Sequence, residues 1–486
     1  MSRPPSNALV VIIDALRADR VGACGGQFEL TPNIDELAEE ATAFSNAFAC
    51  TNATDPSVTS LHTGRDPMAV STHHGPIVPP DEKDRLNTVP VLPEILSRSG
   101  YRTYATGRTL GRWHRRGFDS CTGESVDKET RRRIGEALQR VSPTLRSTVG
   151  AVYEKAKSFS GQVRPRDEIE EMLSHINSGD GPFYGYVHAM DTHVPYEPDA
   201  ELVERLLEER TYPNQSLSTF FDENDGPYYS EFLRDSLTER DFEVGLARLF
   251  ARYDAAVIEA DTKIGRLVEG LKRRDLFEDT VLVVASDHGE SLDEHGIYFD
   301  HHGLYDETVR VPLVVRTPDS SGAVCDEPVM LKDVPHTLLA LLNTGETLGG
   351  TGRSFAPLVS ETQEAWEPRE SLVFGEAHAQ RRVAIRTQDA KYLKHVPDPV
   401  LEAERGSSTR CGYCDTVHET EALFDLEADP DEVENVVRQR PTAAGELEHR
   451  LDEYIDSLDL VAGGGRETEF DDDDEALDRL EDLGYV

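Results

Sequence analysis

The sequence predicts an α/β protein with a mostly parallel sheet covered by helices on both faces, followed by a small C-terminal α+β subdomain. Residues 8–13 and 280–285 are continuous branched-apolar runs, of the kind found in strands that are buried on both faces. Helical patterns alternate with such strands along the chain, which is typical of a parallel sheet. The 486 residues leave room for one large α/β domain and a smaller one, at roughly 100 to 200 residues per domain.

The remaining elements follow from turn signals and apolar periodicity. In chain order, helices are expected at 31–43, 91–99 and 242–271, and strands at 311–315, 372–375, 382–385 and 391–395. The first of these helices has a Thr-Pro start signal. An acidic loop is expected at 429–434.

These elements divide the chain into a large domain at 1–365, a small subdomain at 366–460 and an acidic tail at 461–486. An Arg-rich helical insert is expected at about 120–178 within the large domain. Segment 98–166 has a net charge of +10, from 16 basic and six acidic residues. Two explanations fit this segment: charge balance against the acidic body, or a positive surface beside an anionic substrate.

The charge of the whole chain excludes several classes of partner. It has 50 basic and 92 acidic residues, a net charge of −42, which argues against binding to nucleic acids and to anionic membranes. Only nine of the basic residues are Lys. This acidic, Lys-poor composition suggests a halophile-like protein that works in concentrated salt, where charge repulsion is screened.

Membrane insertion and a disulfide framework are not expected either. No stretch approaches the roughly 20 apolar residues that span a bilayer, and the first apolar run ends at Asp14 without a small-residue cleavage site. Six cysteines in a chain of this length do not form a disulfide framework, so we expect a cytoplasmic protein. Cys411 and Cys414, with His418, lack the second Cys pair of a zinc clip, and two free thiols are the simpler interpretation.

Two of the predicted strands end in carboxylates. Asp14 follows the first strand, and Asp287 and His288 follow the strand at 280–285. Ligands of open α/β sheets bind beyond the carboxyl ends of the strands, so these side chains can converge although they lie far apart in sequence. Carboxylates and imidazole are ligands of divalent metals, and Gly289 allows a close backbone approach.

Ordered motifs accompany this pair through most of the chain. They are Asp14-Ala-Leu-Arg17, Thr31-Pro32-Asn33, Thr54-Asp-Pro-Ser57, His62-Thr63-Gly64, Gly107-Arg108, His193-Val-Pro195-Tyr196, Asp287-His288-Gly289-Glu290, Tyr305-Asp-Glu307, Arg310-Val-Pro312 and Leu423-Phe-Asp425. With them, the sequence resembles the sulfatase family of the alkaline phosphatase superfamily. The resemblance implies an alkaline phosphatase/sulfatase-like fold and makes residues 1–365 the sulfatase-like catalytic domain.

The resemblance also identifies the nucleophile. The family's C/S-x-P-S-R motif has a Thr-Gly pair nine and ten residues after a Cys that is oxidised to formylglycine. Counting back from Thr63-Gly64 aligns Thr54 with that Cys, whereas Cys50 fails the count and is interpreted as a small buried residue. Val58 replaces the Arg of the motif, and Ala15 stands where many sulfatases have a second metal-binding Asp.

These departures favour phosphate monoesters or diesters over sulfate esters. Formylglycine hydrate can expel sulfate by eliminating its second hydroxyl, whereas a threonyl ester must be attacked by water at the central atom, which phosphorus tolerates better. We therefore expect a metal-dependent ester hydrolase that acts on a small anionic ester through a covalent Thr54 intermediate. A sulfatase without formylglycine, a phosphotransferase to an alcohol, and a non-catalytic binding protein remain alternatives.

The resemblance implies a role for each further site residue. Asp14, Thr54, Asp287 and His288 would hold calcium, manganese or zinc, as one ion or two. Arg108 would bind the anionic substrate where sulfatases have a Lys, or lie on the surface in a salt bridge. His193 and His301 would contact the leaving group as acids, and His302 would bind substrate or cap a turn. His193, His301 and His302 could instead hold a second metal. His295 is interpreted as structural.

Overall fold

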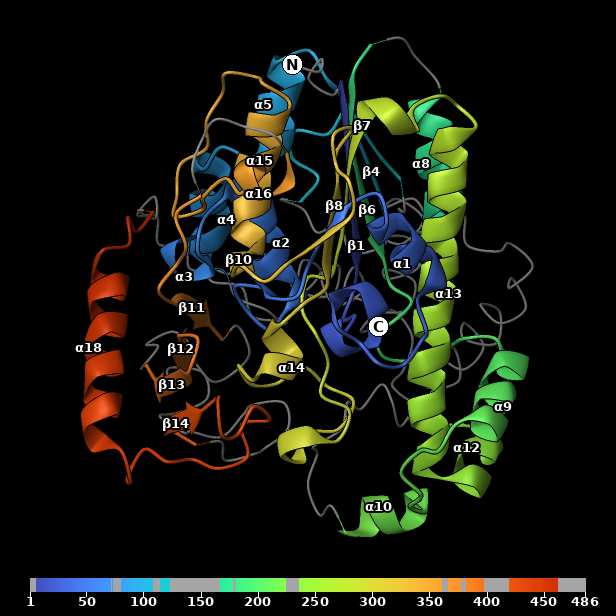
Figure 1. The fold of residues 1–486 in the computed structure, drawn as a ribbon, viewed down its shortest axis with the longest axis vertical. Helices are drawn as coiled ribbons and strands as arrows, with labels where there is room; N and C mark the ends of the chain where they lie inside the picture. The colour runs from blue at the N-terminus through green and yellow to red at the C-terminus, as the bar shows by residue number, and fades with distance from the viewer. Residues whose placement is uncertain are drawn as a thin grey trace, which may run out of the picture.

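The computed structural model describes residues 6–70, 72, 80–107, 114–122, 167–177, 181–223, 236–360, 366–376, 382–396 and 419–461. Its centre is an eight-stranded sheet in the order β5-β4-β6-β1-β7-β8-β2-β9 (Figure 1). The strands are β1 (Asn7–Ile13), β2 (Thr42–Phe44), β4 (Arg102–Gly107), β5 (Ser120–Thr122), β6 (Phe183–Ala189), β7 (Thr280–Ala285), β8 (Leu313–Arg316) and β9 (Ala323–Cys325). All neighbours from β5 to β7 are parallel, whereas β8 is antiparallel to both β7 and β2. The predicted mostly parallel sheet is confirmed.

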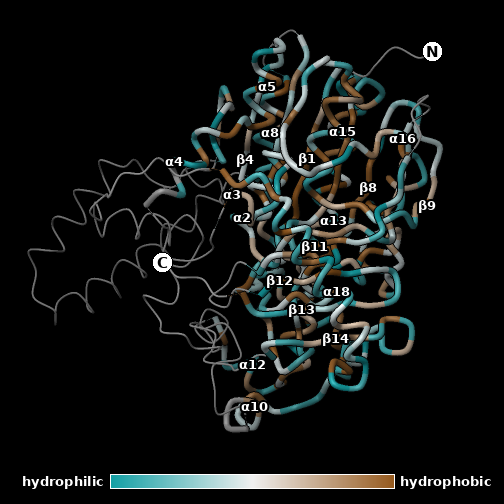
Figure 2. Tube along the Cα trace, turned by 90° about the vertical axis from the view of Figure 1, so that its left-hand side faces the viewer, coloured by the Kyte–Doolittle hydropathy of each residue, from teal (hydrophilic) through white to brown (hydrophobic). Residues whose placement is uncertain are grey.

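Helices cover both faces of this sheet. One face carries α1 (Pro32–Ala38), α8 (Glu168–Ile176) and α13 (Leu246–Lys272), and the other carries α2 (Thr54–Thr63), α5 (Leu92–Arg98), α15 (Val334–Leu341) and α16 (Ala356–Val359) (Figure 1). Strand β1 is buried on both sides, because Leu9, Val11 and Ile13 pack toward the first group and the alternate residues toward the second. This is why its sequence is continuously apolar from Ala8 to Ile13. Figure 2 shows the apolar strands between more polar outer segments.

Shorter elements connect these layers. They are α3 (Pro67–Val70), α4 (Pro80–Thr88), α9 (Ala200–Glu209), α10 (Leu217–Glu223), α12 (Glu239–Val244), α14 (Asp306–Val309), the paired strands β3 (Ala47–Phe48) and β10 (Val329–Met330), and the 3-10 turns η1 (Ala18–Arg20), η2 (Gly22–Cys24), η3 (Phe277–Asp279), η4 (Glu294–Gly296) and η5 (Leu331–Asp333). Helix α9 packs on α13 through Val203 and Leu206, which contact Ala251 and Ala255. Within the described residues, no helix combines the length and the hydropathy that a membrane span needs.

The C-terminal subdomain is a four-stranded antiparallel sheet with one helix. Its strands are β11 (Leu372–Gly375), β12 (Arg382–Arg386), β13 (Ala390–His395) and β14 (Glu421–Asp425), and its helix is α18 (Pro441–Asp456). Helix α18 covers one face, and the other face packs against Phe48, Leu304 and Tyr305 of the large domain. A buried ion pair attaches the helix as well, because Lys332 Nζ lies 2.9 Å from both Asp66 Oδ1 and the Tyr454 hydroxyl. The predicted C-terminal α+β subdomain is confirmed.

Two predicted helices differ from the structure. The helix expected at 31–43 ends at Ala38, because residues 42–44 form β2 and pair with β8 in the buried sheet. The helix expected at 242–271 begins at Leu246, since Gly245 has a φ of 92° and separates α12 from α13. Only glycine adopts such a backbone easily.

Several expected features lie outside the described residues. They are Arg108, residues 123–166 of the Arg-rich insert, the acidic tail from 462, and the thiols Cys411 and Cys414 with His418. Within the insert region, the structure describes β5 at its start and residues 167–177 with helix α8 at its end.

Candidate active site

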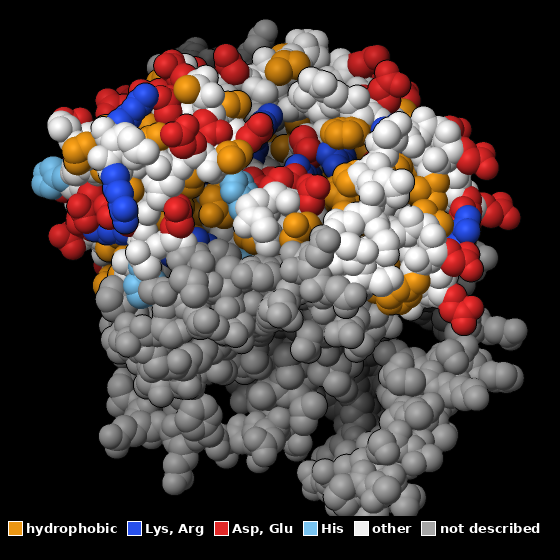
Figure 3. All heavy atoms as spheres, turned by 90° about the horizontal axis from the view of Figure 1, so that it is seen from below, with side chains coloured by type: hydrophobic (Ala, Val, Ile, Leu, Met, Phe, Trp, Pro, Cys, Tyr) orange, Lys and Arg blue, Asp and Glu red, His pale blue; other side chains and the backbone are white. Residues whose placement is uncertain are grey.

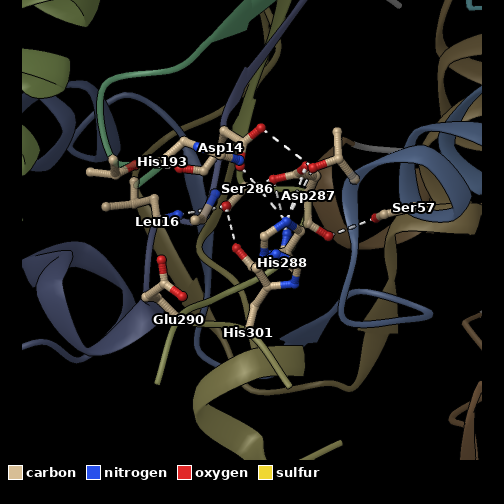
Figure 4. Close-up of polar contacts among 12 residues, drawn as sticks. Asp14, Leu16, Ser57, His193, Ser286, Asp287, His288, Glu290 and His301 are labelled. Atoms are coloured by element: carbon tan, nitrogen blue, oxygen red, sulfur yellow. Dashed lines mark hydrogen bonds and ion pairs between the residues drawn. The ribbon is translucent and has the colours of Figure 1, made fainter. Parts of the chain in front are cut away.

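Two neighbouring parallel strands deliver the central carboxylates. Asp14 follows β1, and Ser286, Asp287 and His288 follow β7, which pairs with β1 over its whole length. Asp14, Asp287 and His288 are all at most 1% exposed, and they offer ligand atoms that lie within 4.8 Å of one another. Figure 4 shows the three side chains turned toward a common point. Among the described residues, no other three acids, histidines or cysteines bring their ligand atoms this close together.

Each carboxylate uses one oxygen for hydrogen bonds and leaves the other without a partner. Asp14 Oδ2 lies 2.9 Å from His188 Nε2, and Asp287 Oδ1 accepts from the backbone N–H groups of Ala15 and His288 at 3.3 and 3.1 Å. Asp14 Oδ1 and Asp287 Oδ2 are buried and have no hydrogen-bond partner in the described part of the chain. Because unpaired buried carboxylate oxygens are costly, this arrangement fits a cation.

His288 completes the group in the orientation that a metal ligand needs. Its Nδ1 lies 2.8 Å from Gly289 O, so the proton belongs on Nδ1 and Nε2 keeps its lone pair. That Nε2 lies 3.7 Å from both Asp14 Oδ1 and Asp287 Oδ2, too far for hydrogen bonds but suited to a shared ion. Gly289 is required beside it, because a Cβ there would lie 2.0 Å from Glu307 O.

Thr54 is the first residue of α2 and faces the same point. Its Oγ1 lies 3.2 Å from His288 Nε2 and 3.4 Å from Asp14 Oδ2, and the residue is 3% exposed. The Ser57 hydroxyl donates to Asp287 O at 2.6 Å and ties the helix start to the loop after β7. The geometry therefore brings together all four predicted metal-centre residues, Asp14, Thr54, Asp287 and His288.

The positions that depart from the family pattern have local explanations. Val58 is buried in the apolar cluster between α2 and the sheet. Ala15 contributes only its backbone: its N–H donates to Asp287, and its carbonyl accepts from the Tyr253 hydroxyl at 2.8 Å. Cys50 is fully buried, and burial raises the pKa of its thiol to about 12, as an unreactive buried residue requires.

The pKa values of the two carboxylates shift in opposite directions. Burial alone would raise the pKa of Asp14, but the neighbouring His193, His188 and His288 lower that pKa well below its usual range. Burial raises the pKa of Asp287, and the Asp14 charge raises it further. Two adjacent buried carboxylates without a cation thus repel one another, which again fits a positive ion between them.

The predicted leaving-group histidines lie on two sides of this centre. His193 follows β6. Its backbone N–H donates to Met190 O at 3.1 Å, and its Nδ1 lies within hydrogen-bond distance of Val194 O. The His301 ring lies 4.4 Å from the His288 ring, and its Nδ1 lies 2.6 Å from Asn52 O. Figure 4 shows His193 beside Asp14 and His301 beside His288.

The alternative second metal site would need His193, His301 and His302 to lie close together. Their ligand atoms do not form a close group among the described residues. His302 Nε2 instead lies 3.5 Å from Asp300 Oδ1, and its ring is nearly perpendicular to that of His301. Arg108 lies outside the described residues, but β4 ends at the adjacent Gly107, whose register partner is His188. The chain therefore leaves the sheet at the active-site edge just before Arg108.

Sequence reasoning missed His188 on β6. The segment reads Phe-Tyr-Gly-Tyr-Val-His-Ala, and its polar and glycine residues interrupt the apolar pattern that marks a buried strand. A histidine one residue before the end of a strand, ahead of the His193 motif, is a signal that could have found it.

Comparisons with known proteins agree with this geometry. The profile of the sulfatase family matches residues 6–344, and that of the N-sulphoglucosamine sulphohydrolase C-terminal region matches residues 293–401. The choline-sulfatase of Rhizobium meliloti is 25% identical over 460 residues, which cover 90% of this chain and 83% of the relative.

Solved structures share the fold at lower identity. A protein solved in complex with its substrate D-glucosamine-2-N,6-O-disulfate has a TM-score of 0.66 and 18% identity, over 96% of this chain and 100% of that chain. The phosphonate monoester hydrolase of Agrobacterium radiobacter has a TM-score of 0.65 and 18% identity, over 96% of this chain and 98% of that chain. Because the family profile matches more than half of the chain, the protein belongs to the sulfatase family of the alkaline phosphatase superfamily and is an ester hydrolase.

Proposed function

We propose that this protein hydrolyses phosphate monoesters or diesters by a two-step reaction through a covalent Thr54 intermediate. One observation carries the proposal. The hydroxyl at the start of α2, 3.2 Å from His288 Nε2 and 3.4 Å from Asp14 Oδ2, belongs to a threonine and not to a cysteine that can become formylglycine. A threonyl ester has no second hydroxyl to eliminate, so its central atom must accept attack by water.

Asp14 Oδ1, Asp287 Oδ2, His288 Nε2 and Thr54 Oγ1 would hold one divalent ion. The mix of carboxylate oxygens, a hydroxyl and one imidazole suits manganese, zinc or calcium. When bound, such an ion supplies positive charge that lowers the pKa of the Thr54 hydroxyl and offsets the charge on the substrate's non-bridging oxygens.

In the first step, Thr54 Oγ1 attacks phosphorus as the bond from phosphorus to the leaving alcohol breaks. The hydroxyl donates to Asp14 Oδ2 at 3.4 Å, and Asp14 takes this proton as the bond from Oγ1 to phosphorus forms. His301 is the proposed proton donor to the leaving oxygen. Its Nδ1 donates to Asn52 O and fixes the ring, so Nε2 carries the proton that is transferred.

In the second step, water attacks the threonyl phosphate and the bond from phosphorus to Thr54 Oγ1 breaks. His301, now neutral at Nε2, accepts a proton from the attacking water and so returns to its starting state. Asp14 Oδ2 returns its proton to Thr54 Oγ1 as phosphate leaves. An alcohol that entered in place of water would receive the phosphoryl group, which is the transferase alternative.

A sulfatase that works without formylglycine is the second candidate. The named relatives support it, since the choline-sulfatase aligns with 90% of the chain. The phosphonate monoester hydrolase that shares the fold supports a phosphorus ester instead. A positive surface at Arg108 would suit either anion.

A substrate panel separates these candidates. The enzyme is stripped with EDTA, reloaded with manganese, zinc or calcium in high potassium chloride, and given 4-nitrophenyl phosphate, bis(4-nitrophenyl) phosphate and 4-nitrophenyl sulfate. We expect kcat/KM for one of the phosphorus esters to exceed that for the sulfate at least about tenfold. Preference for the sulfate would reject the phosphate assignment. Glycerol as an acceptor tests transfer, since nitrophenol release would then exceed phosphate release.

The nucleophile is tested by Thr54→Ala, which should lower kcat about a thousandfold or more, while Thr54→Ser should retain measurable turnover. Thr63→Ala is the matched control. Thr63 ends the same helix and is 2% exposed. Its hydroxyl donates to the Thr59 carbonyl at 2.7 Å and accepts from the Arg65 backbone N–H at 3.3 Å, so kcat of this variant should be unchanged. Full activity in Thr54→Ala would remove the proposed nucleophile. Absence of divalent-metal binding in a calorimetric titration of the stripped protein would instead favour a non-catalytic binding protein.

A further inference from the structure

Strand β6 carries three polar aromatic side chains in a row that leads to Asp14. Tyr184, Tyr186 and His188 alternate along the strand and so share one side of the sheet, and each is at most 1% exposed. His188 pairs in register with Ile12 of β1, two residues before Asp14. A buried imidazole in the middle of a sheet needs partners for both ring nitrogens.

His188 has both partners. Its Nε2 lies 2.9 Å from Asp14 Oδ2, and its Nδ1 lies 2.9 Å from the Tyr186 hydroxyl. Burial raises the pKa of the Tyr186 phenol well above its usual range, so the hydroxyl keeps its proton and can donate it to Nδ1. In that arrangement the His188 proton sits on Nε2 and points at Asp14. The result is a directed chain from Tyr186 through His188 to one oxygen of the carboxylate.

This chain of hydrogen bonds determines which oxygen of Asp14 can bind a cation. With Oδ2 held by His188, the oxygen that remains is Oδ1, which is buried and has no partner among the described residues. Asp14 would then coordinate through one oxygen. Without His188 the carboxylate could rotate and bind with both oxygens, or take a shorter hydrogen bond from the Thr54 hydroxyl, now 3.4 Å away.

We propose that His188, held by Tyr186, is a positioning residue that fixes Asp14 as a ligand through Oδ1 alone and so sets the affinity of the metal centre. His188 acts through Asp14 and is not itself a ligand. Its Nε2 is engaged by Asp14 and lies 3.9 Å from Asp287 Oδ2, and His188 is not part of the close ligand group. Partners of this kind typically change metal affinity about 10- to 100-fold.

This proposal rests on the metal centre of the proposed function but not on the choice of phosphate or sulfate. It is tested by calorimetric titration of the EDTA-stripped full chain with manganese chloride alone. We expect His188→Ala to weaken manganese binding about 10- to 100-fold. His188→Gln, whose side-chain amide can replace the Nε2 donor, should restore binding to within about threefold of the parent protein.

The two tyrosines supply a matched pair of variants. Tyr186→Phe removes the hydroxyl that holds His188 and should weaken manganese binding several-fold. Tyr184 lies on the same strand and is as deeply buried as Tyr186, but its hydroxyl has no hydrogen-bond partner among the described residues. Tyr184→Phe should therefore leave manganese binding unchanged. Circular dichroism checks that every variant is folded, and the tyrosine pair keeps the test decisive if His188→Ala does not fold.

Other results of the manganese titrations would overturn the proposal. Equal loss of binding in His188→Ala and His188→Gln would make His188 a direct ligand. Unchanged binding in His188→Ala, or equal effects of the two Tyr→Phe changes, would leave His188 with a packing role only. A failed substrate panel with intact manganese binding would reject the proposed substrate class and leave this inference standing.

Discussion

Thr54 and Val58 stand one turn apart at the start of α2, and both differ from the family motif. Thr54 Oγ1 reaches the centre formed by Asp14 and His288, whereas Val58 points into the apolar cluster with Leu61 and Ala285. A guanidinium at position 58 would be needed only to support formylglycine, which this chain does not encode at position 54. The two substitutions are therefore consistent with one another: an unmodified nucleophile and an apolar neighbour.

Restoring the family residue at position 58 should damage the protein. Because Val58 is 1% exposed, Val58→Arg would bury a charge without a partner and should lower the free energy of unfolding by more than about 2 kcal/mol. Urea denaturation measures this loss. Val58→Ile is the control and should change stability by less than about 1.5 kcal/mol. A stable Val58→Arg protein with new sulfate ester turnover would mean that this position faces the substrate.

Among the elements, the loop after β7 is stabilised by His295, a histidine outside the candidate metal site. His295 in η4 has a φ of 55°, stacks on Tyr305 with ring centroids 3.6 Å apart, and places Nε2 3.2 Å from Glu307 Oε1. Burial would lower the pKa of His295, but the hydrogen bond and charge of Glu307 raise it above its usual value. The folded protein thus binds this proton more tightly than the unfolded chain.

The stabilisation by His295 should depend on pH. For a histidine whose folded pKa is raised, the contribution is complete below the unfolded pKa of about 6.5 and disappears as pH rises through the folded value. His295→Asn, which tolerates the positive φ, should therefore lose about 1 to 2 kcal/mol of stability at pH 5.5 and much less at pH 9, by urea denaturation. His449→Asn alters an exposed pair with Glu453 and should show no such difference. Equal losses at both pH values would mean that only packing was changed.

The elements also show what sequence patterns can and cannot predict. Strands β1 and β7 were predictable because both faces are buried and every position after the first is apolar, and the carboxylates at their ends followed from that. Strand β6 was not, because Tyr186 and His188 serve the active site and Gly185 is required where a Cβ would lie 2.6 Å from Leu9. The contact of His188 with Asp14 depends on the register between β6 and β1, which no local pattern encodes.

For the molecule as a whole, acidity is the dominant surface property. Asp and Glu outnumber Lys and Arg on the described part of the face seen in Figure 3, in line with 92 acidic against 50 basic residues in the chain. Self-repulsion of this size destabilises the compact state at low ionic strength and is screened by salt. Asp14, Asp287 and His288 of the candidate metal site are buried, so salt screens their charges much less.

The thermal midpoint should therefore rise with salt. Between 0.1 and 3 M potassium chloride we expect an increase in Tm of roughly 5 to 10 °C, which corresponds to a few kcal/mol for a protein of this size. Differential scanning calorimetry measures it, and sucrose at matched osmolality controls for effects other than screening. A Tm that falls or stays constant in potassium chloride would show that the acidic surface is not an adaptation to salt.

The register of the central sheet also has a kinetic consequence. His188 and Asp14 are separated by 174 residues, and Thr54 and His288 by 234, so these side chains meet only after distant segments have paired. Such long-range contacts close late in folding, which means that no early intermediate can contain a finished binding site. An ion captured by this centre would then stabilise only the completed sheet, and it would protect the enzyme by slowing unfolding rather than by speeding folding.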